Sequence, residues 1–132
     1  MIVRLRDGQY REPAGPGAAT EIRVSLLDRI TAWTAGGRRY AAVILVTDPG
    51  GSGTFYDLVV VEDRRGRAVE AASAALGDRV RVESLTLARR DGQMELHVGL
   101  VVHGPDDPLC CPARPLVRAF VWTGRALVPR TD

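Results

Sequence analysis

The chain contains no lysine and no asparagine, and all eighteen of its basic residues are arginine. The codons of lysine and asparagine are rich in A and T, so this double absence indicates a GC-rich genome rather than a function that requires arginine. Loss of asparagine also removes a thermolabile residue, but depletion of lysine is not the usual thermophile signal. Codon bias is therefore the simplest interpretation.

The chain also lacks a strong charge of either sign. Its eighteen arginines stand against sixteen acidic residues, which gives a formal net charge of +2, and the acids are interleaved among the arginines. A duplex-binding protein is expected to carry a broad basic patch. The sequence therefore predicts no nucleic-acid partner.

Long apolar runs are absent as well. No run approaches the roughly 20 apolar residues of a membrane span, so no transmembrane segment is predicted in this chain. The first residues, 1–7, lack the apolar core and cleavage site of a signal peptide. We expect a soluble chain, either as it stands or as the mature part that follows a targeting segment. Its 132 residues, 45% of them hydrophobic, fit a single domain over 1–132 that folds without a metal or a disulfide.

The apolar positions follow the two-residue period of strands, and helical periodicity is nearly absent. The clearest alternation covers 94–102, with apolar side chains at even positions. Continuous apolar runs over 41–46 and 55–61 predict strands that are covered on both faces. Turn signals separate the segments at 36–39, 49–53, 62–67, 89–92 and 123–124. The sequence predicts an all-β fold, an antiparallel meander of about eight strands whose bent sheet closes toward a barrel or sandwich.

Two segments depart from simple alternation. Val80 and Val82 have even parity whereas Leu85 and Leu87 have odd parity, which predicts a β-bulge near Glu83-Ser84. The segment 68–76 carries a helical stripe of apolar residues closed by a glycine, so one short helix near 69–76 is an alternative. Because this segment lies between two turn signals at hairpin spacing, we favour a strand.

The only two cysteines, Cys110 and Cys111, are adjacent. Neighbouring Cα atoms lie about 3.8 Å apart, shorter than the roughly 4.4–6.8 Å of an unstrained disulfide, so pairing would close a strained eight-membered ring. Three interpretations stay open: a proline-stiffened structural loop with paired or packed thiols, a metal site with His103 and Asp106 or Asp107, and a nucleophilic cysteine assisted by His103. No third catalytic group and no zinc-type cysteine spacing accompany the pair, so the structural loop is favoured and no catalytic residue is assigned.

A second candidate is the ligand loop Gly50, Gly51, Ser52 and Gly53. Small residues allow backbone N–H groups to approach an anion. A P-loop, however, requires Gly-Lys-Ser/Thr at the start of a helix, and here there is no lysine and a strand follows. A flexible hairpin loop is the favoured interpretation.

Four aromatic residues near arginine-bearing turns form a third candidate, a stacking surface for single-stranded nucleic acid. All four lie within apolar runs, which is more typical of a core. They are Phe55, Tyr56, Phe120 and Trp122.

Three motifs occur in order: Gly-Gly-Ser-Gly-Thr-Phe-Tyr at 50–56, Leu-Gly-Asp-Arg-Val at 76–80 with Glu83-Ser84, and His-Gly-Pro-Asp-Asp-Pro-Leu-Cys-Cys-Pro at 103–112. Together they resemble a family of uncharacterised bacterial proteins that look secreted or lipoprotein-like. The resemblance spans about 7–128. It implies an extracytoplasmic location, secreted or lipid-anchored, with a tether to the membrane surface through a segment before Met1. It also implies an oxidising compartment, where adjacent cysteines can stay paired.

Many members of that family carry an acidic, calcium-like loop before an Ala-Ala-Val strand. The matching stretch here, 33–43, contains no carboxylate. Calcium requires several oxygen ligands, so we expect no metal and no cofactor. The sequence predicts a non-catalytic binding or accessory module with an unknown partner. The alternative is a redox-active or metal-binding protein that uses Cys110, Cys111 and His103.

Overall fold

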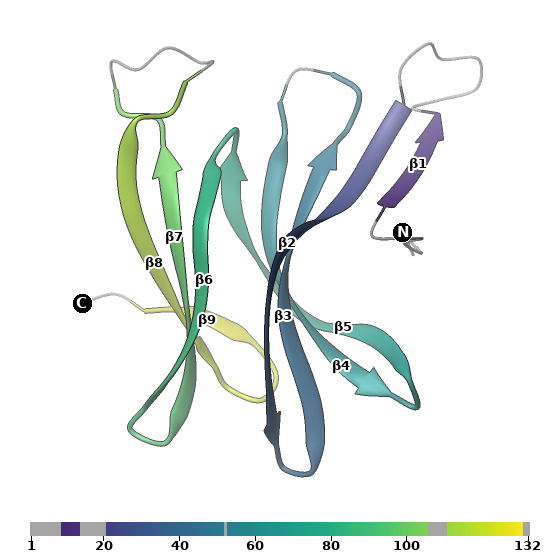
Figure 1. Ribbon diagram of the computed structural model, residues 1–132, viewed down its shortest axis with the longest axis vertical. Helices are drawn as coiled ribbons and strands as arrows, with labels where there is room; N and C mark the ends of the chain where they lie inside the picture. The colour runs from purple at the N-terminus through teal and green to yellow at the C-terminus, as the bar shows by residue number, and fades with distance from the viewer. Residues whose placement is uncertain (1–8, 14–20, 52, 106–110, 131–132) are drawn as a thin grey trace.

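Antiparallel hairpins make up nearly all of the described chain (Figure 1). The computed structural model describes residues 9–13, 21–51, 53–105 and 111–130. Within these ranges there is no helix, and therefore none long and apolar enough to cross a membrane. The described strands are β1 (Gln9–Pro13), β2 (Glu21–Ala35), β3 (Arg38–Asp48), β4 (Phe55–Arg64), β5 (Arg67–Asp78), β6 (Arg81–Arg90), β7 (Gln93–Val102), β8 (Arg114–Trp122) and β9 (Leu127–Pro129).

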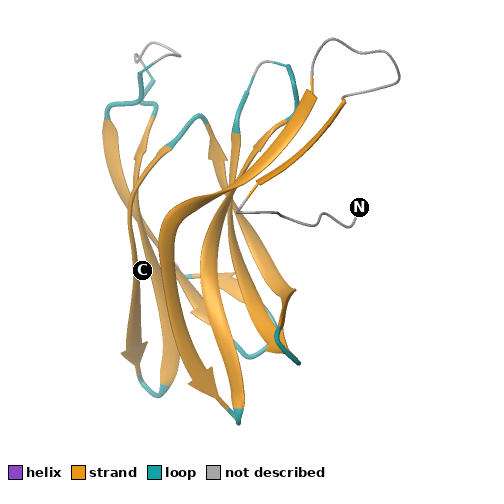
Figure 2. Cartoon of the chain, turned by 45° about the vertical axis from the view of Figure 1, so that its right-hand side comes forward, coloured by secondary structure: helices purple, strands orange, loops and turns teal. Residues whose placement is uncertain are grey.

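The strands form two hydrogen-bonded sheets (Figure 2). One has five strands in the order β1-β2-β3-β4-β5, and the other has four in the order β6-β7-β8-β9. Every pair is antiparallel and joins strands that are consecutive in sequence. Between β5 and β6 the chain passes to the second sheet, and there the Arg79 N–H donates to the Thr54 carbonyl oxygen (2.8 Å). The predicted all-β meander is confirmed, with nine described strands in two sheets.

Three two-residue turns have the geometry that matches strand twist. Both central residues of each turn have positive φ, as a type I′ turn requires. Asp91 (51°) and Gly92 (78°) form the turn that the Asp-Gly pair predicts. Gly36-Gly37 and Arg65-Gly66 form the other two, at predicted turn positions. In the second of these, the Gly66 N–H donates to the Asp63 carboxylate (2.8 Å), which fixes the turn further.

The core lies between the two sheets, and three aromatic side chains join them. Trp33 of β2 and Tyr40 of β3 are stacked, with ring centroids 5.7 Å apart. Both contact Trp122 of β8 in T-shaped geometry, at 6.2 and 5.3 Å. The largest fully buried side chains are Phe120, Ile44, Leu58, Leu96, Leu100, Val60 and Val98. The predicted core positions of Phe120 and Trp122 are therefore confirmed.

The middle of β4 is buried on both faces. Its consecutive residues 58–60 are all buried, and Val59 pairs with Val43, which is also buried, on the face that points away from the second sheet. The prediction that the continuous apolar runs are covered on both faces is therefore confirmed for their centres, 42–44 and 58–60. The predicted core position of Phe55 is wrong: this side chain is 45% exposed, because it begins β4 at the end of the sheet among polar cross-strand neighbours.

The helix considered near 69–76 is not formed, and the segment belongs to β5. The strand pairs with β4 along its whole length, with register shifts between Tyr56 and Asp57 and between Val60 and Val61 of β4. Each shift interrupts the two-residue alternation of β5. The β5 side chains that pack against the core are Ala71, Ala72, Ala74 and Leu76, whereas Val69 and Ser73, which belong to the apparent helical stripe, are exposed.

Two bulges shape the remaining strands. The register between β6 and β7 shifts between Val82 and Ser84, which confirms the predicted bulge. A larger irregularity in β2 lies between Leu26 and Ile30, which pair with residues only two apart in β3. Within it, Leu27 packs against the core while its two successors in β2 are exposed.

Candidate functional site

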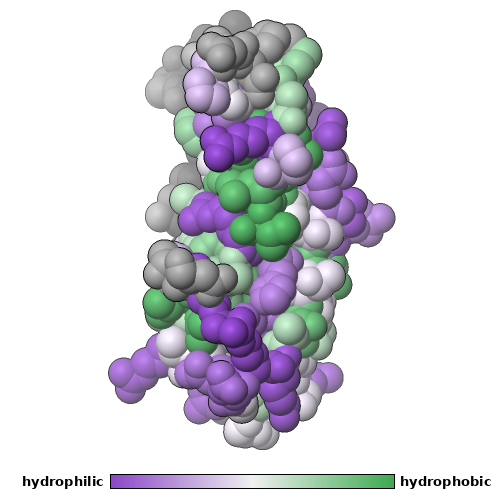
Figure 3. All heavy atoms as spheres, turned by 90° about the vertical axis from the view of Figure 1, so that its left-hand side faces the viewer, coloured by the Kyte–Doolittle hydropathy of each residue, from purple (hydrophilic) through white to green (hydrophobic). Residues whose placement is uncertain are grey.

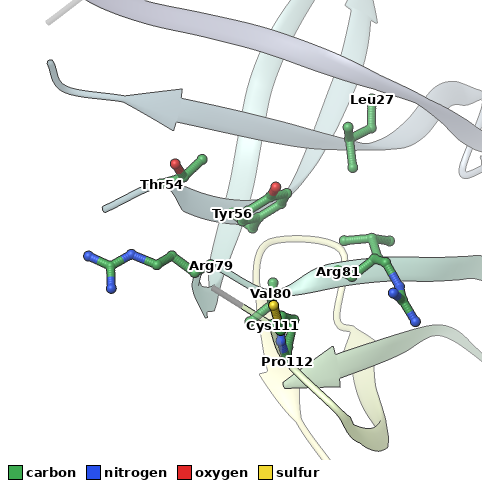
Figure 4. A pocket seen from close by; sticks show the side chains of 9 residues that line it. Leu27, Thr54, Tyr56, Arg79, Val80, Arg81, Cys111 and Pro112 are labelled. Atoms are coloured by element: carbon green, nitrogen blue, oxygen red, sulfur yellow. The ribbon is translucent and has the colours of Figure 1, made fainter. Parts of the chain in front are cut away.

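A pocket of about 660 Å³ opens at the seam between the two sheets, where β5 passes to β6 (Figure 4). Its walls are formed by residues of β2, the start of β4, the β5–β6 connection with the start of β6, and the segment before β8. The lining residues are Leu27, Thr54, Tyr56, Arg79, Val80, Arg81, Val82, Cys111 and Pro112. We call this cavity the seam pocket.

The irregular parts of the fold create the seam pocket. The bulge in β2 turns Leu27 inward at one wall. Across the seam, β6 contacts β2 but belongs to the other sheet, and it supplies the buried Val82. The connection between β5 and β6 turns sharply at Arg79, whose φ is 52°. The pocket therefore lies where two sheets meet without backbone pairing between their strands.

Two arginines flank the seam pocket on opposite sides (Figure 4). The Arg81 guanidinium pairs with Glu83 at 2.6 Å, and its side chain is 64% exposed. The Arg79 side chain is 31% exposed and lies 3.8 Å from the Asp78 carboxylate, at the outer limit of an ion pair. Arg79 therefore keeps most of its hydrogen-bonding capacity for an additional anion.

The inner wall of the seam pocket is apolar with two hydroxyl groups. Neither the Thr54 nor the Tyr56 hydroxyl makes a hydrogen bond with another described residue, and both line the cavity. Leu27 and Pro112 supply apolar surface opposite one another (Figure 4). Such a wall suits an apolar body with a few polar contacts that fix its orientation.

Of the predicted redox or metal residues within the described ranges, Cys111 lies at the seam pocket and His103 does not. Cys111 lines it, is exposed and is disulfide-bonded. The chain has one other cysteine, Cys110, which lies outside the described residues together with Asp106 and Asp107. His103 is half-buried just after β7 and is not part of the lining. Among the described residues, no group of three potential metal-ligating side chains occurs.

In the glycine-rich candidate loop, the N–H of Gly50 and that of Thr54, the residue after the loop, donate to carboxylates of the chain itself. The Gly50 N–H donates to the Asp48 carboxylate at 3.0 Å, and the Thr54 N–H donates to Asp78 at 2.8 Å. Gly51 is exposed, Gly53 has φ of 115°, and Ser52 lies outside the described residues. Because carboxylates of the chain already accept these two hydrogen bonds, these N–H groups are not available to bind an anion.

A buried carboxylate lies on the outer face of the second sheet, away from the seam pocket. Glu95 is 2% exposed and accepts hydrogen bonds from His97 (3.0 Å) and from Arg130. The His97 hydrogen bond and then Arg130 hold the Glu95 pKa below its usual 4.5, against the opposing effect of burial. Arg130 follows β9, so this cluster fastens the end of the described chain to β7.

Sequence reasoning missed most of the residues that form the seam pocket. Leu27, Arg79 and Arg81 belong to segments that meet only through the packing of the two sheets. The signal available was the motif at 76–80, which places Arg79 beside a glycine and an aspartate at a turn. The sequence predicts Tyr56 in the core, and the side chain does pack against the core, but it also forms part of the pocket wall.

Comparisons with known proteins found no match: no protein-family model, no curated protein sequence and no solved structure is significantly similar to this chain. The resemblance drawn from the three ordered motifs stays a prediction.

Proposed function

We propose that this protein is a non-catalytic binding module and that its ligand occupies the seam pocket. The observation that carries the proposal is the combination of an apolar wall, two unengaged hydroxyl groups and two flanking arginines around one cavity. Binding sites for small molecules are typically concave, largely apolar and equipped with a few convergent polar groups. The seam pocket is open to solvent and has a mixed lining, with the Thr54 and Tyr56 side chains on its wall and the two guanidinium groups at its edges.

The lining favours an anionic ligand with an apolar body. Leu27, Val82 and Pro112 offer apolar contacts to the body, and the Tyr56 hydroxyl offers a hydrogen bond. A carboxylate, sulfonate or phosphate at the mouth would accept hydrogen bonds from the Arg79 guanidinium, whose donors form a planar fork. The lining therefore favours an amphipathic acid over a sugar as the ligand, because few hydrogen-bonding groups line the wall.

The chemistry of the lining supports binding rather than catalysis. The described lining residues include no carboxylate and no histidine to serve as a general acid or base. The Cys111 sulfur is in a disulfide, whereas a nucleophilic cysteine acts as a thiolate.

The disulfide also supports an extracytoplasmic location. Disulfides persist in oxidising compartments and are rare in reducing cytosol. Cys111 is exposed, so a cytosolic thiol pool would have direct access to its bond. We propose that the protein works outside the cytoplasm of a bacterium, secreted or lipid-anchored.

A redox-active protein is the second candidate, because an exposed disulfide forms part of the pocket wall. Accessible disulfides are the ones that exchange with external thiols. Measuring the reduction potential separates the two functions. A potential near that of thiol–disulfide oxidoreductases would favour redox activity, and resistance to millimolar glutathione would favour a structural bond in a binding module.

The binding proposal is tested with 8-anilinonaphthalene-1-sulfonate, an aromatic sulfonate of the expected chemistry. We expect saturable fluorescence enhancement, weakened about tenfold in the Arg79→Gln/Arg81→Gln variant because charge-assisted hydrogen bonds are lost. The matched control, Arg89→Gln/Arg125→Gln, removes the same charge from turns outside the pocket and should leave the affinity unchanged. Two outcomes would contradict the proposal. One is an equal loss of affinity in the two double variants, and the other is the absence of saturable binding to the wild-type protein.

A further inference from the structure

We infer that the end of the molecule opposite the seam pocket is a basic surface that binds a bilayer of anionic phospholipids. The surface consists of four hairpin turns, 36–39, 62–67, 89–92 and 123–126, and we call it the basic pole. It is independent of the seam pocket, because it shares no residue with the pocket lining.

The topology gathers these turns at one end. In an antiparallel meander, alternate connections emerge on the same side, and here the β2–β3, β4–β5, β6–β7 and β8–β9 turns all lie toward the lower end in Figure 1. The connection from β5 to β6 lies at the upper end, with the seam pocket. Residues far apart in sequence therefore share one surface.

The charge of the chain is concentrated at the basic pole. The four turns hold eight of the eighteen arginines but only three of the sixteen acidic residues, so they carry a formal charge of +5 while the rest of the chain carries −3. The overall value of +2 conceals this separation. The interleaving of acids and arginines along the sequence is consequently not preserved in space.

Two of the three acids at the basic pole are directed into it rather than outward. Glu62 is 6% exposed and pairs with both Arg38 (3.0 Å) and Arg64 (2.9 Å). Asp63 is half-buried and pairs with Arg39. The three arginines themselves stay exposed, with 63–74% of each side chain accessible. The acids anchor the arginines from beneath and leave guanidinium groups at the surface.

Four further arginines of the basic pole make no ion pair with any residue in the described part of the chain: Arg65, Arg67, Arg89 and Arg125. All four are exposed. On the face that Figure 3 shows, hydrophilic side chains predominate at the lower end, and further ones lie along the upper half. The pole thus presents uncompensated positive charge to the solvent.

The shape and composition of the basic pole suit a flat anionic surface. Separate hairpin tips at one end allow their arginines to approach headgroup phosphates simultaneously, and guanidinium groups bind phosphate in a bidentate manner. Of the aromatic residues nearest the turns, Trp122 is buried and Tyr40 is half-buried with its ring against Trp33 and Trp122, so the described pole has no exposed stacking platform for unpaired bases. Its turns hold no large apolar side chain to insert between lipid chains. The attachment is therefore electrostatic, peripheral and sensitive to salt.

Sedimentation of the whole protein with phospholipid vesicles tests the inference. We expect binding to vesicles that contain phosphatidylglycerol at 20 mM salt, release at 500 mM salt, and no binding to phosphatidylcholine vesicles. The Arg89→Gln/Arg125→Gln variant should lose about fivefold in partitioning per arginine, or about twenty-five-fold in all. Arg11→Gln/Arg114→Gln lowers the net charge equally at exposed positions outside the pole and should retain most of the binding.

Three results would overturn the inference. One is the absence of salt-sensitive binding to the anionic vesicles. Another is an equal loss in the two double variants, which would show that net charge alone is responsible. The third is tighter binding to duplex DNA than to vesicles at the same phosphate concentration, which would assign the basic pole to nucleic acid. The Arg79→Gln/Arg81→Gln variant separates this test from that of the seam pocket. Its substitutions lie in the pocket and outside the basic pole, so it should lose affinity for the sulfonate and retain most of its binding to vesicles.

Discussion

The hydroxyl oxygen of Ser84 lies 2.4 Å from the point that a β-carbon at position 99 would occupy. Ser84 is the residue at which β6 resumes its pairing after the bulge, and Gly99 is its cross-strand partner in β7. A glycine inside a strand often marks the close approach of another part of the chain. Here the Ser84 side chain, next to the bulge, occupies the space that a side chain at position 99 would need.

Replacing this glycine should destabilise the protein through a steric clash. We expect Gly99→Ala to lower the free energy of unfolding by about 1–3 kcal/mol, the range typical of overpacking. In the Ser84→Ala background the same change should cost much less, because the hydroxyl that blocks the site is gone. Urea unfolding of the four proteins in this double-mutant cycle measures the coupling. Additive effects would mean that the two residues do not compete for space.

The bulge itself could be predicted from the sequence, because the apolar residues change from even to odd positions within one strand. The role of Gly99 could not, because it depends on which residue of β6 lies opposite. The same reason explains why the hairpins were predicted and the seam pocket was not. Turn residues act locally, whereas Leu27 and Arg79 meet only after the chain passes to a second sheet. The residues of the turn before Val80 do not indicate whether the chain forms an ordinary hairpin there or passes to another sheet.

Acid should weaken the attachment of the end of the described chain to β7. The pKa of Glu95 is lower in the folded protein than its usual 4.5, mainly through the His97 hydrogen bond, so its carboxylate contributes stability above that value. The contribution is lost as the pH falls through the lowered pKa of the folded state. We expect wild-type stability in urea to fall more steeply below pH 4.5 than that of Glu95→Gln, which is less stable at pH 7. Glu70→Gln, which removes an exposed carboxylate, should follow the wild-type profile. Parallel profiles for all three proteins would exclude this role for Glu95.

Asp57 should have the opposite effect on stability. Partial burial raises its pKa above the usual 3.8, so ionisation disfavours the folded state. Its cross-strand neighbours, Leu45 and Ala75, offer no hydrogen bond from their side chains. We expect Asp57→Asn to stabilise the protein at pH 7 by about 0.5 kcal/mol or less, and the gain to shrink as the pH is lowered toward 3. Thermal unfolding at both pH values measures the difference. A loss of stability at pH 7 would reveal a favourable partner for the carboxylate.

The state of the cysteines can be read from intact mass. Because Cys111 is disulfide-bonded, the native protein should take up no iodoacetamide, and the reduced, unfolded protein should take up two equivalents. A mass equal to that of the monomer would assign the bond to the two cysteines of one chain. A bond between sequence neighbours closes almost no loop, so reduction should change the melting temperature little. Two alkylated thiols in the native, unreduced protein would contradict the disulfide and weaken the case for an oxidising compartment.

The central claim is that the seam pocket is the ligand site, and amide chemical shifts test it most directly. The protein labelled with ¹⁵N is titrated with 8-anilinonaphthalene-1-sulfonate, and each amide resonance is followed to saturation. The account predicts that the largest shifts fall at Leu27, Thr54, Tyr56 and 79–82, with none of comparable size at the turns 89–92 and 123–126. Shifts confined to those turns, or spread evenly over the two sheets, would contradict it.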